Sequence, residues 1–159
     1  MSEIKIQNLK NALIKHLYSN DDVVKLIDAT EELESNDDLL GTHIFPFFKV
    51  NYTLKETGTY ICIKIDEMNN SYNESFSPYK FSIMIVSHNE HLLYESCSRV
   101  DVLGEKVKEL LAWNDDFGFQ LKLKNSSEGF LGEKYYYRTL EFISQTYNNL
   151  QNKIGRNCK

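Results

Sequence analysis

The sequence of 159 residues predicts an α+β domain, in which helices pack on one face of a mainly antiparallel sheet of four to five strands. Residues Thr59–Asp66 alternate between apolar and polar side chains, as a strand with one buried face does. Tyr79–Ser87 is apolar on both faces at its centre, which is typical of a strand inside a sheet. Helical spacing then relates five apolar residues of the segment Arg99–Trp113: Val100, Leu103, Val107, Leu110 and Leu111.

Two helices are expected before the sheet. Ser2–Leu17 places its apolar residues on one side, and Asp21–Ala29 follows a capping residue, Ser19. The segment Thr30–Gly41 is expected to be a loop with one helical turn. Its acidic clusters lack the alternating oxygen ligands and central glycine of a calcium loop, so we interpret them as helix caps.

The segment Thr42–Val50 is aromatic and extended, but Pro46 restricts it to an edge strand or an irregular arm. In the next strand, Ile61, Ile63 and Ile65 should face the core, while Cys62, Lys64 and Asp66 should face outward. The polar link Glu67–Ser77 is too long for a tight hairpin and is expected to project from the body. The strand Tyr79–Ser87 then returns antiparallel to the strand before it.

Gly104 lies inside the predicted helix Arg99–Trp113, where glycine costs about 1 kcal/mol relative to alanine. A close crossing over the sheet would explain it, and a neighbouring subunit is a second explanation. Two further strands are expected, Phe119–Lys124 and Lys134–Tyr147, joined by a connection over Asn125–Glu133. Residues 1–147 would form a single domain, followed by a polar tail over residues 148–159 that a partner could order.

The formal net charge of −5, with both signs interspersed, argues against a nucleic-acid binder. No apolar run approaches the roughly 20 residues that span a bilayer, so no membrane partner is expected. The N-terminus lacks the pattern of an export signal, and three cysteines without metal-like spacing indicate reduced thiols in a cytosol.

The sequence predicts neither an enzyme nor a cofactor or metal site. The helical zinc motif requires two histidines four apart, and His88 and His91 are three apart in a predicted loop. Carboxylates at Asp66, Glu67 and Glu141 have no spacing that forces them together. Cys62 lacks the signature of an activated nucleophile. The run Tyr135–Tyr137 could stack bases, but without basic neighbours it is better explained as strand or interface.

Several segments exceed what a small monomer needs, and they predict a homo-oligomer that buries them. They are the arm, the projecting link, the tyrosine-rich strand and the tail. The predicted assembly interface consists of nine apolar or aromatic residues: Phe45, Pro46, Phe47, Phe48, Tyr72, Phe76, Phe130, Tyr135 and Tyr137.

From about Lys5 to Tyr147 the chain resembles the tail terminator, or tail completion, proteins of long-tailed bacteriophages. The segments that carry the resemblance are Ile44-Phe45-Pro46, Thr59–Asp66, Phe81–Ser87 running into His88, Arg99–Trp113, Phe119–Lys124 and Tyr135–Ile143. The form Ile85-Val86-Ser87-His88, followed by Arg99-Val100-Asp101-Val102-Leu103, is similar to neck proteins of phages that infect low-GC bacteria.

The resemblance implies a ring, typically hexameric, that is assembled in the host cytoplasm and becomes part of the virion neck. Such a ring caps the tail tube and gives the head connector its docking surface, and DNA only passes through its lumen. It implies neither catalysis nor a cofactor. Three alternatives stay open: a head–tail connector or stopper, a small metal-dependent nuclease or hydrolase, and a regulatory binding module.

Overall fold

A computed structural model describes residues 6–29, 34–48, 57–68, 78–112, 117 and 119–145. It confirms the α+β fold. Three α-helices are described: α1 (Ile6–Tyr18), α2 (Asp21–Ile27) and α3 (Arg99–Leu111). Two short 3-10 helices accompany them, η1 (Asn36–Leu39) and η3 (Asn89–His91). The predicted helical turn within the loop Thr30–Gly41 corresponds to η1.

Five strands form one sheet in the order β1-β2-β3-β7-β6. Their bounds are β1 (Ile44–Phe45), β2 (Thr59–Glu67), β3 (Tyr79–His88), β6 (Gln120–Leu131) and β7 (Tyr135–Gln145). All pairs are antiparallel except β1 with β2, which is parallel. A separate small hairpin joins β4 (Leu93–Tyr94) to β5 (Cys97–Ser98) just before α3. The central position predicted for Tyr79–Ser87 and the edge position predicted for the proline-containing arm are both confirmed.

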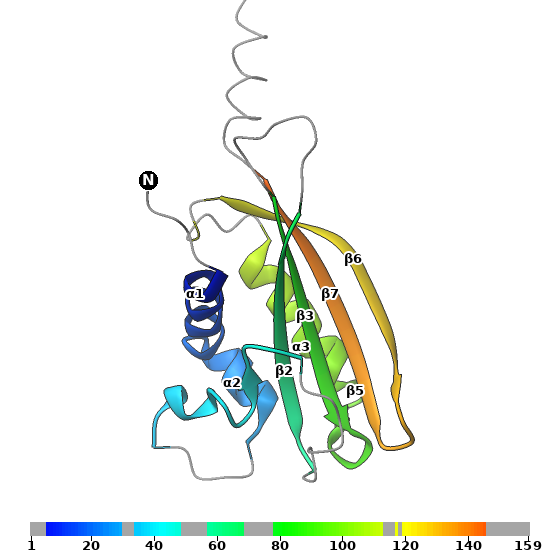
Figure 1. The fold of residues 1–159 in the computed structure, drawn as a ribbon. Helices are drawn as coiled ribbons and strands as arrows, with labels where there is room; N and C mark the ends of the chain where they lie inside the picture. The colour runs from blue at the N-terminus through cyan, green and yellow to red at the C-terminus, as the bar shows by residue number, and fades with distance from the viewer. Residues whose placement is uncertain are drawn as a thin grey trace, which may run out of the picture.

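The main core lies between the helices and one face of the sheet. Figure 1 shows α3 crossing behind β3 and β7, with α1 and α2 beside β2. Fully buried core residues come from every layer: Leu13, Leu17, Ile27, Ile61, Ile63, Phe81, Ile83, Leu103, Val107, Leu140 and Phe142. Because α1 and α3 each present one apolar stripe, their burial on the sheet contributes to the hydrophobic stabilisation of the fold.

The opposite face of the sheet has its own apolar cluster, and this corrects the expectation for Cys62. Cys62 is fully buried instead of facing solvent, together with Phe45, Tyr60, Val86 and Tyr135; Met84, Leu131 and Tyr137 pack against them. We call these eight residues the aromatic cluster. Alternation did place Cys62 on the face away from the isoleucines. The prediction was wrong because that face is not wholly solvent-exposed.

The prediction of an irregular connection over Asn125–Glu133 is also wrong. Strand β6 continues through it to Leu131, with one bulge between Leu123 and Asn125, and a tight turn then leads to β7. Gly132 occupies that turn with φ +63°, a left-handed conformation that glycine adopts without strain. Serine, asparagine and glycine indicated a loop, but pairing with β7 overrides their local preference.

Gly104 lies at a close crossing of α3 over the sheet, as predicted. A β-carbon at this position would lie 2.9 Å from Cδ of Arg138 on β7. The absence of a side chain therefore lets Arg138 pass beneath the helix and reach Asp101, where Nε lies 2.7 Å from Oδ1. The glycine is explained within one copy of the chain.

Candidate functional site: the two borders of the sheet

The candidate site consists of the two borders of the sheet, where large apolar side chains are exposed. At the β1 border, Phe47 is 54% exposed, Phe48 37% and Leu40 49%. At the β6 border, Phe130 is 69% exposed. Exposed apolar side chains that gather at one place mark interaction surfaces more often than scattered ones do. The β1 border, where three such side chains gather, therefore qualifies as a contact surface, and the β6 border adds the single exposed ring of Phe130.

The predicted interface residues divide between surface and interior. Phe47, Phe48 and Phe130 are exposed, and Pro46 and Tyr137 are half-buried. Phe45 and Tyr135 are buried in the aromatic cluster, so in one copy they support the surface instead of forming it. The predictions for Tyr72 and Phe76 fall outside the described residues.

The aromatic cluster fixes the β1 border in place. The rings of Phe45 and Tyr60 lie 6.2 Å apart, and the imidazole of His43 stacks on Tyr60 at 5.2 Å. The Nζ of Lys10 on α1 donates to the carbonyl oxygen of Pro46 at 2.6 Å. The exposed side chain of Phe47 therefore extends from a backbone that is held from both sides.

The β6 border is held by a polar network around Arg138. In addition to Asp101, its guanidinium donates to Ser126 Oγ at 2.8 Å and to Glu128 Oε2 at 2.9 Å. Tyr136 also donates to Glu128, and this hydrogen bond raises the pKa of Tyr136 to about 12. The ring of Phe130 meets Tyr136 edge-on at 5.2 Å. The outermost strand is thus tied to α3 through β7.

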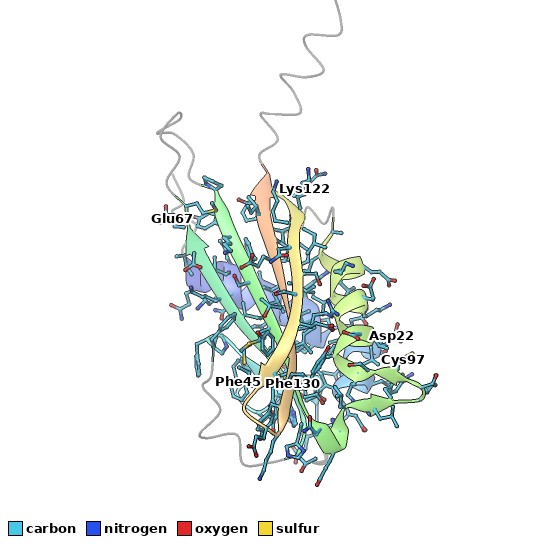
Figure 2. The ribbon with its side chains drawn as sticks, turned by 90° about the vertical axis from the view of Figure 1, so that its right-hand side faces the viewer. Asp22, Phe45, Glu67, Cys97, Lys122 and Phe130 are labelled. Atoms are coloured by element: carbon cyan, nitrogen blue, oxygen red, sulfur yellow. The ribbon has the colours of Figure 1, made fainter. Side chains whose placement is uncertain are left out.

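The other end of the sheet carries exposed charges. Asp66 and Glu67 end β2, and Lys122 lies near the start of β6. Figure 2 shows Glu67 and Lys122 at one end of the sheet, and Phe45 and Phe130 toward the other. Each border therefore combines an apolar region with a charged end. Asp66 and Glu67 lie at the charged end of the β1–β2 border, and Lys122 lies at the same end of the β6 border.

Within the chain, the carboxylates at this end already have cationic neighbours. Lys64 lies 3.2 Å from Asp66, and Lys80 lies 2.9 Å from Glu141. The hydrogen bond with Glu141 raises the pKa of Lys80. Lys80 pairs with Asp66 across the strands, so it lies between the two carboxylates that a metal would have to bridge. Among the residues described, no three His, Cys, Asp or Glu side chains gather as a metal ion would require.

A second polar cluster lies between α2 and the sheet. His91 Nδ1 lies 2.8 Å from Thr59 Oγ1, and His91 Nε2 lies 3.4 Å from Asp28 Oδ2. The order hydroxyl–imidazole–carboxylate has the form of a nucleophile with its base. However, Thr59 is fully buried, and its hydroxyl also bonds to Ser87 Oγ at 3.0 Å. Because a substrate could not reach the hydroxyl, we interpret the cluster as a link between the helices and the sheet.

Arg99 completes this link. Its Nε donates to the carbonyl of His91 at 2.8 Å, and its Nη1 donates to the carbonyl of Leu26 at 2.8 Å. Burial lowers the pKa of His91, and the neighbouring Arg99 cation lowers it further, against the opposing effect of Asp28. The sequence contains no signal that Leu26, 73 positions away, would be a partner of Arg99.

A shallow groove of about 430 Å³ lies between α2, β4 and α3. Leu26, Tyr94 and Val102 supply apolar lining, and Lys106 lies at the groove with its Nζ 3.0 Å from Asp22. The local spacing of these residues did not predict the groove, because its walls come from three segments that are distant in the sequence. The exposed residues Leu40 and Leu93 were also missed, since a single exposed leucine leaves no periodic signal.

None of the helices that the structure describes is long and apolar enough to cross a membrane. Residues 10–143 match the model of one protein family, described as YomW. Neither a curated protein nor a solved structure matches the chain. The matched range spans every strand of the sheet and all three helices, apart from the first residues of α1 and the last of β7.

Proposed function

The chain belongs to the YomW family, which is associated with phage genomes, and from this premise we propose that it is a structural virion protein. Its role would be that of a ring-forming tail terminator or neck subunit. The ring would cap the tail tube and join it to the head connector. No reaction is part of this role, which depends on surfaces that fit neighbouring molecules.

The observation that carries the proposal is the pair of sheet borders. A monomer gains nothing from exposing Phe47, Phe48 and Phe130, because each places apolar surface in water. The two borders differ in sequence and in charge, and the surface that each offers is held by packing and hydrogen bonds. Two unlike contact surfaces on opposite sides of one subunit are what a closed head-to-tail ring uses.

The charge of the chain fits a conduit for DNA. A net charge of −5 per copy gives a ring a negative potential, which would repel the phosphate backbone and keep DNA from adhering as it passes. A protein that holds DNA would need a basic surface instead.

Size-exclusion chromatography with light scattering tests the ring, and pull-downs against tail-tube protein and portal-side connector protein test its neighbours. We expect a closed oligomer that binds the tail tube. A strict monomer at high concentration that binds neither protein would rule the proposal out. An oligomer that binds only portal-side partners would instead support the neighbouring role of a head–tail connector or stopper.

A further inference from the structure

We infer that the β6 border of one copy packs against the β1–β2 border of a second copy, with the two sheets at the same level. The inference rests on the proposed function, since it names the surfaces that would build the ring. It assigns Lys122 and Phe130 to one side of the contact. Asp66, Glu67 and the exposed aromatic residues of the arm form the other side.

Strand directions make this contact possible. β2 is antiparallel to β3, β3 to β7, and β7 to β6, so β2 and β6 run in opposite directions within one sheet. When a second copy is placed beside the first in the same orientation, its β6 runs antiparallel to β2. Because strands twist relative to one another, the second copy is rotated as well as shifted, and a repeated rotation is what closes a ring.

The register places opposite charges in one row. Asp66 pairs with Lys80, Lys80 with Ile143, and Ile143 with Lys122. Asp66 and Lys122 therefore end the same row at opposite borders, on the same face of the sheet. Lys122 is exposed, and the side chain of Asp66 is 42% exposed. Copies aligned at the same level would bring the carboxylate of one copy to the ammonium group of the next.

The apolar regions align in the same arrangement. Phe130 pairs with Tyr136, which pairs with Ser87, which pairs with Thr59 at the start of β2. β1 lies beside Ile61 and Cys62 in that same half of the sheet, and Phe47 and Phe48 follow it. The exposed aromatic side chains of both borders are thus in the half of the sheet away from Asp66. Aligning the charges places these aromatic side chains at the same level of the contact, with Phe130 on the helix-covered face that it shares with Thr59 and Phe45 on the opposite face with Cys62.

The β6 edge is also suited to selective pairing. Among the described residues its partner strand is β7, and one isolated bridge also joins Leu121 to Ala112. Lys124–Glu128 is exposed along its whole length. Charged and polar side chains on an edge discourage unspecific strand pairing. A partner must then supply complementary charges, which makes the contact selective for a surface such as the β1–β2 border.

Charge reversal tests the contact on the full-length protein. We expect Lys122→Glu and Asp66→Lys, each alone, to raise the apparent dissociation constant of self-association about tenfold. The double variant should return it to within about threefold of the wild type, because the pair is restored with exchanged signs. Lys25→Glu is the matched control, since Lys25 is also exposed but lies on α2 in the helical layer. Sedimentation velocity measures all four variants.

The outcomes separate the inference from the proposed function. A wild type that assembles and is weakened by both single reversals, with rescue in the double variant, supports the inference. A wild type that assembles equally well with either reversal overturns these surfaces and leaves the ring in place. A wild type that stays monomeric overturns both. Thermal unfolding of each variant shows whether a loss of assembly reflects a loss of folding.

Discussion

His91 lies between α2 and the sheet, with each ring nitrogen next to a different element. Its Nδ1 is 2.8 Å from Thr59 on β2, and its Nε2 is 3.4 Å from Asp28 at the end of α2. Burial and the Arg99 cation lower its pKa in the folded protein below the ordinary value of 6.5. The unfolded chain therefore takes up a proton at a higher pH than the folded protein does.

The sign of the pH dependence follows from this lowered pKa. Well above pH 6.5 His91 is neutral in both states and adds no pH dependence. As the pH falls from 6.5 toward the lowered folded pKa, the free energy of unfolding should decrease. Urea unfolding at several pH values measures it. His91→Asn, which can keep a bond to Thr59, should flatten this part of the profile, whereas the control His88→Asn should retain it. An unchanged profile in His91→Asn would contradict the assignment.

The substitution Gly104→Ala offers a second test, because the added methyl group has two opposing effects on the free energy of unfolding. Alanine gains about 1 kcal/mol in helix propensity. Its β-carbon would lie 2.9 Å from Arg138 Cδ, and Arg138 is tied to Asp101, Ser126 and Glu128. We expect the clash to prevail and Gly104→Ala to cost about 1 kcal/mol of unfolding free energy.

A double-mutant cycle isolates the cause. The three atoms nearest to the added methyl group all belong to the Arg138 side chain. In an Arg138→Ala background these contacts are removed, so Gly104→Ala should then stabilise the helix by about 1 kcal/mol. Chemical denaturation of the four proteins gives the coupling energy. Equal effects of Gly104→Ala in both backgrounds would show that Arg138 moves aside at no cost.

Strand β6 combines a structural and a surface role along its length. Leu121 is buried in the main core, whereas Phe130, near the other end, is 69% exposed. Phe130→Ser should change the free energy of unfolding by no more than about 0.5 kcal/mol, since little apolar surface is returned to water. It should weaken self-association, because the exposed ring belongs to the proposed contact.

Leu93→Ser is the matched control for β6. Leu93 is 72% exposed, but it lies on the β4–β5 hairpin and outside both borders. We expect it to change neither stability nor assembly. Light scattering as a function of protein concentration compares the two variants, and equal weakening by both would argue against a specific role for the β6 border.

The whole molecule carries opposite charges at one end of its two borders and apolar residues in the other half. A contact of this kind predicts a partial dependence on salt. Raising the salt concentration to about 1 M shortens the Debye length to about 3 Å and should weaken self-association severalfold. The apolar part is not screened, so association should then level off. Sedimentation equilibrium measures this, and association that strengthens steadily with salt would indicate an apolar contact alone.

Much of the fold could be predicted because its signals are local. The stripe that begins at Val100 and Leu103 identifies α3, and the alternation of Ile61, Ile63 and Ile65 identifies β2. The length of β6 could not be read in this way. Its outer half is Asn125-Ser126-Ser127-Glu128-Gly129, and only hydrogen bonding to β7 makes that segment a strand.

The candidate site was predicted only in part, because some of its residues give a local signal and others are placed by packing between strands. A run of phenylalanines beside Pro46 indicated a contact surface in the arm, and the structure exposes Phe47 and Phe48 there. In the sequence, Phe45 and Tyr135 could not be told apart from the exposed interface residues, but the structure buries both. Their burial depends on the aromatic cluster, whose members come from five strands.

The sequence by itself determined the helices, the central strand and the two classes of side chain on each strand, because periodicity follows from the geometry of one backbone segment. Only the tertiary structure decided which distant residues meet. The row from Asp66 to Lys122, the passage of Arg138 under Gly104 and the burial of Cys62 all depend on register between strands. Register is set by how the strands pair and pack together, and no single segment contains that information.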